Sequence, residues 1–110
     1  MPRRSYVSDF EAMVLLAVIR VGDDAYGVPV SREIESATGR TVAVAAVYAA
    51  LQRLESRGLV TSETGEPTPI RGGRAKRVFR ATAKGVAAAR EMARAFMALW
   101  SGIPQLRLRG

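Results

Sequence analysis

Apolar residues recur at the spacing of a helix face from residue 10 onward and predict a first helix over about 8–20. Ser8 can cap this helix, because Glu11 stands three residues later in a capping box. Leu15, Leu16 and Ile19 widen the apolar stripe, so the helix is expected to be buried on several sides, partly by a second subunit. The stripe itself consists of Phe10, Met13, Val14, Ala17 and Val18.

Two more helical patterns follow, and each ends at a glycine. The first covers about 27–38, has Pro29 in its first turn and ends at Gly39; its inward positions are Val30, Ile34 and Ala37. The second covers about 43–57 and ends at Gly58; its inward positions are Val44, Val47, Leu51 and Leu54. The opposite face of this third helix presents Ala45, Ala46, Ala49, Gln52, Arg53 and Ser56, with Tyr48 on the border.

The pattern then changes to two strands, over 59–63 and 76–81, joined by a loop rich in Gly and Pro. Phe79 and Ala81 are predicted to point inward. Thr82 caps a last helix that reaches about residue 100. The predicted fold class is mainly α with a small β hairpin, a winged helix-turn-helix followed by a C-terminal dimerisation helix. The expected parts are a flexible basic arm (1–7), a winged-helix DNA-binding domain (8–82), a dimerisation helix (83–103) and a tail (104–110).

The composition of the 110 residues excludes several kinds of chemistry. Without His or Cys, the chain has no disulfide, zinc finger, thiol nucleophile or Ser-His arrangement. Glu33, Glu35 and Glu55 have the spacing of ordinary helix-surface carboxylates. No enzyme activity, metal or cofactor is therefore expected.

The net charge of +7 is concentrated in one part of the chain. Residues 67–110 hold 10 basic and 1 acidic side chains, whereas residues 1–66 hold 7 basic and 9 acidic ones. Six basic residues and no acidic one lie in 71–84. This concentration favours a polyanionic partner, with a merely solvated basic face as the alternative.

Basic residues on or beside the predicted wing are the first candidates for DNA contact: Arg71, Arg74, Lys76 and Arg77. In the third helix, Tyr48 and Gln52 are candidates for base contact and Arg53 for phosphate contact. The alternative for Tyr48 is a half-buried core aromatic. Because the exposed alanines can touch only thymine methyl groups, we expect few base contacts plus DNA shape to carry specificity, and the wing to carry most of the affinity.

The last helix carries a wide apolar stripe that a small domain cannot cover alone, which predicts a symmetric dimer. The alternative is a single helix that folds back on its own core. The expected dimer-interface residues are Leu15, Ile19, Val86, Ala89, Ala93, Phe96 and Trp100. Trp100 is explained as an interface anchor, and Phe96 with Trp100 is also a candidate site for a small, flat aromatic effector.

The longest apolar run, 12–19, has eight residues, too few to span a membrane, and no cleavage site follows it. The expected location is therefore cytoplasmic.

Three stretches of sequence resemble the PadR family of transcriptional regulators. They are FEAMVLL at 10–16 with AYGVPV at 25–30, VYAALQRLESRGLV at 47–60, and GGRAKRVFRATAKG at 72–85. The resemblance implies a winged-helix homodimer that binds operator DNA, usually as a repressor relieved by a small molecule. It also implies DNA contacts at Tyr48, Arg74 and Lys76, and a place for Trp100 in an effector pocket of the short, single-helix subfamily.

Two positions depart from the family pattern. Ala81 replaces a larger aliphatic residue, and the third helix lacks its common N-terminal Ser. The hypothesis is thus a DNA-binding regulator, and the alternative is a winged-helix module that docks an acidic protein partner.

Overall fold

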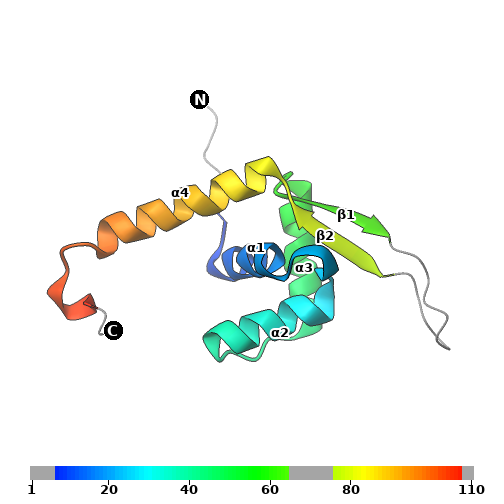
Figure 1. Ribbon diagram of the computed structural model, residues 1–110, viewed down its shortest axis with the longest axis horizontal. Coiled ribbons are helices and arrows are strands. Elements are labelled where there is room, and N and C mark those ends of the chain that lie inside the picture. The colour runs from blue at the N-terminus through cyan, green and yellow to red at the C-terminus, as the bar shows by residue number, and fades with distance from the viewer. Residues whose placement is uncertain (1–6, 65–75, 108–110) are drawn as a thin grey trace.

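The computed structural model describes residues 7–64 and 76–107, shown in Figure 1. Its helices are α1 (Asp9–Val21), α2 (Gly27–Thr38), α3 (Val44–Ser56) and α4 (Ala83–Trp100), and its strands are β1 (Val60–Thr64) and β2 (Arg77–Ala81). Short 3₁₀ turns follow α1 (Gly22–Asp24) and α4 (Pro104–Leu106). This order confirms the predicted mainly α fold with a small hairpin. The arm at 1–6, the wing loop at 65–75 and the end of the tail at 108–110 lie outside the described residues.

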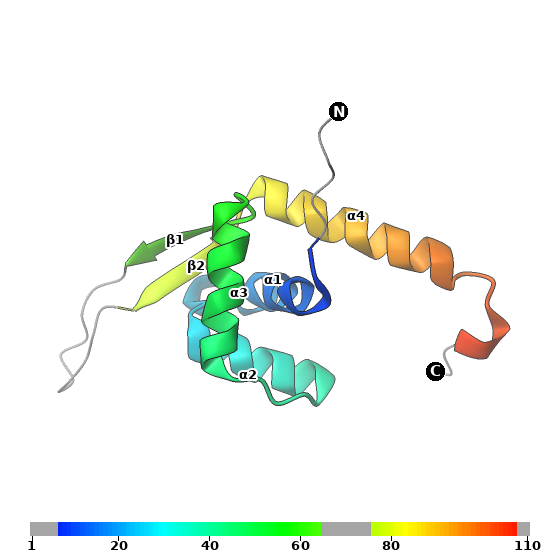
Figure 2. The same ribbon diagram turned by 180° about the vertical axis from the view of Figure 1, so that it is seen from behind.

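The central element is α1, which contacts α2, α3, β2 and α4. In both ribbon views it lies between α2 and α4 (Figures 1 and 2). Val14 and Leu15 have no exposed surface, because their side chains point into the space enclosed by these elements. The burial of each such side chain contributes about 1.5–3 kcal/mol to folding, so α1 supplies much of the core.

The predicted helix ends are confirmed by the hydrogen bonds that cap them. The Ser8 hydroxyl accepts the Glu11 N–H (3.2 Å), and the Thr82 hydroxyl accepts the Gly85 N–H (3.0 Å). Gly39 and Gly58 both adopt φ 76°, a conformation that L side chains rarely adopt, and so end α2 and α3 where the sequence predicted.

One of the three positions of α2 that the sequence predicted to point inward is wrong. Ala37 is exposed, because the last turn of α2 projects beyond the core that buries Val30 and Ile34. Ala50 of α3 is fully buried, although its place in the core was not predicted.

The two strands pair antiparallel, from Val60 opposite Ala81 to Thr64 opposite Arg77. The β1 strand begins one residue later than predicted, because the Leu59 N–H donates to the Leu54 carbonyl (3.0 Å) and belongs to the turn that closes α3. Phe79 is fully buried as predicted, and its N–H donates to the Ala25 carbonyl (2.8 Å). The hairpin is thereby attached to the segment between α1 and α2.

The first turns of α4 pack closely on the domain, and the rest of α4 leaves it. A side chain at Gly85 would overlap the Leu59 carbonyl oxygen, so glycine permits the close approach of α4 to the end of α3. Ala89 is still buried, but every residue from Ala93 to Trp100 is exposed. Figure 1 shows α4 running away from the hairpin.

Candidate nucleic-acid interface

The outer face of α3 is exposed to solvent. Ala45, Ala46, Ala49 and Gln52 are exposed, as the sequence predicted. Figure 2 shows α3 on the outside of the domain, with α1 behind it and the hairpin to one side. Ala43 occupies the N-cap position of α3 without a side-chain hydrogen bond, which agrees with the missing N-terminal Ser. A helix with small residues on its outer face, beside a basic hairpin, has the form of a recognition helix.

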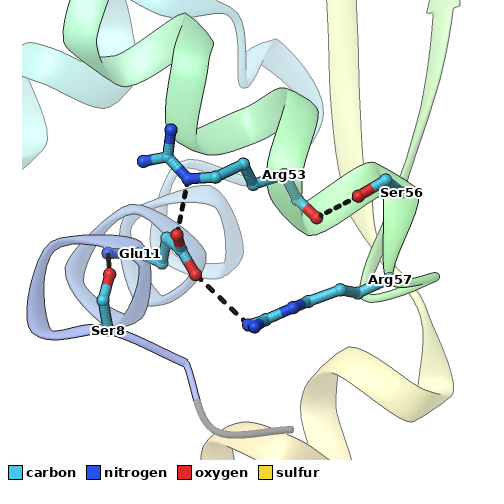
Figure 3. Close-up of polar contacts among 5 residues, drawn as sticks. All are labelled: Ser8, Glu11, Arg53, Ser56 and Arg57. Carbon is cyan, nitrogen blue, oxygen red and sulfur yellow. Dashed lines mark hydrogen bonds and ion pairs between the residues drawn. The ribbon is translucent and has the colours of Figure 1, made fainter.

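A buried carboxylate connects α1 to the end of α3, as Figure 3 shows. Arg53 donates from Nε to Glu11 Oε2 (2.6 Å), and Arg57 donates from Nη1 to Glu11 Oε1 (3.3 Å). The Glu11 side chain is 9% exposed, whereas that of Arg53 is 53% exposed. Glu11 is the one charged side chain buried within the described residues.

Burial of Glu11 by itself raises the pKa of its carboxyl group, because the charged form loses water. The hydrogen bond from Arg53, the Ser8 backbone amide, and the charges of Arg53 and Arg57 act in the opposite direction. Together they outweigh burial and hold the pKa of Glu11 below its ordinary value of 4.5. The carboxylate is therefore charged in the folded protein at neutral pH.

A second carboxylate joins α3 to both strands. Arg77 donates from Nη2 to Glu55 Oε1 (2.8 Å) and from Nε to the Ser62 hydroxyl (2.9 Å). The Ser62 hydroxyl in turn donates to Glu55 Oε2 (2.6 Å). The Arg77 guanidinium also lies 5.5 Å from the centre of the Phe79 ring. These contacts hold the base of the hairpin against the last turns of α3.

Two tyrosines connect the start of α2 to its neighbours. Lys76 donates to the Tyr26 hydroxyl (3.1 Å) and lies 4.5 Å from the centre of the Tyr26 ring. The Tyr48 hydroxyl accepts the Gly27 N–H (3.2 Å), and its ring packs near Phe79 with 6.5 Å between ring centres. Tyr48 is half-buried, which agrees with the core role that the sequence left open. Its hydroxyl hydrogen is not used by the Gly27 bond.

The predicted DNA-contact residues thus differ in their surroundings. Gln52 is exposed on α3, Arg53 is paired with Glu11, and Arg77 is paired with Glu55. Lys76 is exposed and contacts an uncharged partner. Arg71 and Arg74 lie outside the described residues. Sequence reasoning missed four residues that hold these side chains in place: Glu11 as an ion-pair partner, Tyr26, Glu55 and Ser62. The only signal was that Glu11, Tyr26 and Glu55 fall within the family-like stretches.

The predicted dimer-interface residues divide into two groups. Leu15 has no exposed surface and Ala89 is 8% exposed, because both pack inside the subunit's own core. Their assignment to a dimer interface is therefore wrong. Ile19 (41% exposed), Phe96 (60%) and Trp100 (39%) have the exposed surface that an interface requires, Ala93 is exposed and Val86 is half-buried. Leu16 (47%) is also exposed, although it was not among the predicted contacts.

A shallow hollow lies where the chain turns back after α4. Trp100, Ile103, Pro104 and Arg107 line it, together with Ser101 and Gly102. Phe96, the other predicted effector residue, does not line this hollow.

Within the described ranges, no helix is long and apolar enough to cross a membrane.

The fold and the exposed helix beside the hairpin define a winged-helix transcriptional regulator. Residues 15–91 match the transcriptional regulator PadR-like family, and the chain belongs to that family. The family consists of DNA-binding regulators, not of enzymes.

Several solved structures share the fold. A PadR family transcriptional regulator from Eggerthella lenta is 24% identical, with a TM-score of 0.68 and coverage of 86% of this chain and 80% of that chain. A PadR-like regulator from Bacillus cereus is 16% identical, with a TM-score of 0.68 and coverage of 88% and 89%. A transcriptional regulator from Clostridium thermocellum is 23% identical, with a TM-score of 0.66 and coverage of 81% of each chain. No curated protein sequence matches the chain.

Replacement of Glu11 by Gln is expected to lower the free energy of unfolding by about 1–2 kcal/mol at pH 7, because the two arginines lose their charged acceptor. The pKa of Glu11 is lower in the folded chain than in the unfolded one, so its contribution is complete above about pH 5 and declines as the pH falls through the folded pKa. Urea unfolding of both proteins at pH 7 and pH 3 should show the difference shrinking at pH 3.

Glu33→Gln is the matched control, since it breaks an exposed pair with Arg20 (2.7 Å). It is expected to change stability by about 0.5 kcal/mol or less at either pH. An equal loss at pH 7 and pH 3 for Glu11→Gln would contradict the role given to the Glu11 charge.

Proposed function

We propose that this protein is a sequence-specific DNA-binding repressor that acts in the cytoplasm as a homodimer and releases its operator when a small aromatic molecule binds. The observation that carries the proposal is the exposed outer face of α3 beside a basic hairpin. A recognition helix needs such a face to enter the major groove, and the hairpin side chains then lie near the flanking backbone.

In this proposal α3 supplies few base contacts. Gln52 is its exposed amide, which can form two hydrogen bonds with an adenine edge. Ala45, Ala46 and Ala49 offer only methyl groups, which suit thymine methyls. Sequence preference therefore comes from a small number of contacts together with DNA shape.

Phosphate contacts supply most of the affinity. Lys76 stands at the base of the wing, where its partner among the described residues is the uncharged Tyr26, and Arg71 and Arg74 belong to the same segment of the chain. Arg53 contributes less than Lys76, because its guanidinium is already paired with Glu11. The Tyr48 hydroxyl hydrogen is a further donor to phosphate.

The exposed half of α4 supports the dimer. Phe96, Met97 and Leu99 are each at least 60% exposed, an arrangement that costs free energy in water and favours burial against a second copy. Ile19 and Leu16 add exposed apolar surface on α1. A pseudo-palindromic operator requires that two such copies, related by a twofold axis, hold their α3 helices about one turn of DNA (~34 Å) apart.

The proposed effector-binding site is based on Trp100. This residue is 39% exposed and borders the hollow at the end of α4. In a dimer the two copies of Trp100 and Phe96 come from the same face of α4, where a flat aromatic ligand can stack between them.

Footprinting on the DNA around the protein's own gene is expected to show two protected half-sites about one helical turn apart.

Arg74→Ala/Lys76→Ala should weaken binding to all sequences and reduce the slope of log affinity against log salt by about 0.9 for each phosphate that is no longer neutralised. Arg90→Ala/Arg94→Ala removes the same charge from α4 and serves as the control. Binding without any sequence preference would contradict the proposal and favour a module that docks an acidic protein.

Phe96→Glu is expected to convert the dimer into a monomer, because it places a charge in an apolar interface. The molar mass can be measured by light scattering during size-exclusion chromatography. Ala98→Glu adds the same charge at an exposed position of α4 outside the apolar stripe and should leave the dimer intact. A monomeric wild-type protein would contradict the proposed assembly.

Planar aromatic dyes are expected to quench the fluorescence of Trp100, the only tryptophan in the chain, and to lower the affinity for operator DNA. Trp100→Phe should retain the dimer and weaken dye binding, measured by dye fluorescence. The absence of quenching across a broad panel of planar dyes would limit Trp100 to a structural role.

A further inference from the structure

Glu55, Ser62 and Arg77 form a closed ring of hydrogen bonds that joins three elements. Glu55 belongs to α3, Ser62 to β1 and Arg77 to β2. Each member contacts both others: Arg77 with Glu55 at 2.8 Å, Ser62 with Glu55 at 2.6 Å, and Arg77 with Ser62 at 2.9 Å. The Glu55 side chain is 30% exposed and that of Arg77 is 48% exposed, so the ring lies at the surface between α3 and the hairpin.

This ring changes what Arg77 can offer to DNA. Its neighbour Lys76 contacts the uncharged Tyr26, and both basic residues lie at the base of the wing. An arginine already paired with a carboxylate adds little net attraction for a phosphate. To contact a phosphate fully, the Nε and Nη2 groups of Arg77 would have to leave Ser62 and Glu55.

We propose that Glu55 is a specificity-determining residue that withholds Arg77 from sequence-independent phosphate contact and fixes the wing base against α3. The inference rests on the proposed DNA-binding function. Phosphate contacts contribute equally on every sequence, whereas base contacts from α3 discriminate. A carboxylate that cancels one arginine beside the recognition helix therefore lowers non-specific affinity more than it lowers operator affinity.

Glu55→Gln tests this inference, because Gln has nearly the same shape and can still accept from Ser62 but carries no charge. Its affinity for a random duplex is expected to rise about two- to fivefold for each subunit, the amount that release of one partly exposed ion pair allows. The salt slope on that duplex should steepen by about 0.9 for each Arg77 that gains a phosphate. Operator affinity should rise less, so the ratio of operator to random-duplex affinity falls. Fluorescence anisotropy at several salt concentrations measures both quantities.

Two further variants separate the release of Arg77 from the change in net charge. Glu33→Gln makes the same change in net charge at the exposed Arg20 pair and should keep the wild-type ratio. Glu55→Gln/Arg77→Gln keeps the wild-type net charge and should return the random-duplex affinity and the salt slope to wild-type values. Persistence of the gain in this double variant would overturn the inference, because loss of the Glu55 charge alone would then account for it.

The outcomes also distinguish this inference from the function on which it rests. A wild-type protein that prefers its operator, combined with an unchanged ratio in Glu55→Gln, would overturn only the role of Glu55. A wild-type protein without sequence preference would remove the proposed function itself. Thermal unfolding of each variant identifies the temperature below which all of them are folded. Ser62→Ala opens the ring without a change in charge, so it should lower the ratio of operator to random-duplex affinity less than Glu55→Gln does.

Discussion

The buried carboxylate of Glu11 is the contact on which the placement of α3 depends. Apolar packing holds α3 against α1, but dispersion and burial have little directional preference, so neighbouring arrangements differ little in energy. A buried charge is different, because it is stable only where donors surround it. Arg53 and Arg57 supply those donors from the last turn of α3 and its cap, and Ser8 supplies one from the start of α1. The end of α3 is therefore held at one place on α1.

Carboxylates also neutralise part of the positive charge around α3. The chain carries a net charge of +7, yet three arginines at or beside α3 are bound by Glu11 and Glu55: Arg53, Arg57 and Arg77. Lys76, next to one of them, contacts a tyrosine instead. In the proposed function, Lys76 is therefore better placed than the paired arginines to attract a phosphate.

The first turns of α4 and the rest of this helix differ in how their side chains are covered. Up to Ala89 the side chains of α4 find partners in their own subunit, with Gly85 against the Leu59 carbonyl as the closest approach. Beyond Ala93 no element of the described chain covers the helix. The apolar stripe of α4 is thus covered by the subunit's own core at one end and exposed at the other.

The sequence by itself determined the order of elements, the ends of the helices and the family, since these depend on residues close together in the chain. Ser8 and Thr82 cap, Gly39 and Gly58 terminate, and the apolar periods distinguish helix from strand. Only the tertiary structure decided which of the residues predicted for an interface are buried inside the subunit, as Leu15 and Ala89 are, and which arginines are paired. Glu11 and Arg53 are 42 residues apart and Glu55 and Arg77 are 22 apart. Such pairs form only when α1 packs against α3 and the hairpin packs against α3. The residues close to each arginine in the sequence therefore do not predict which carboxylate it binds.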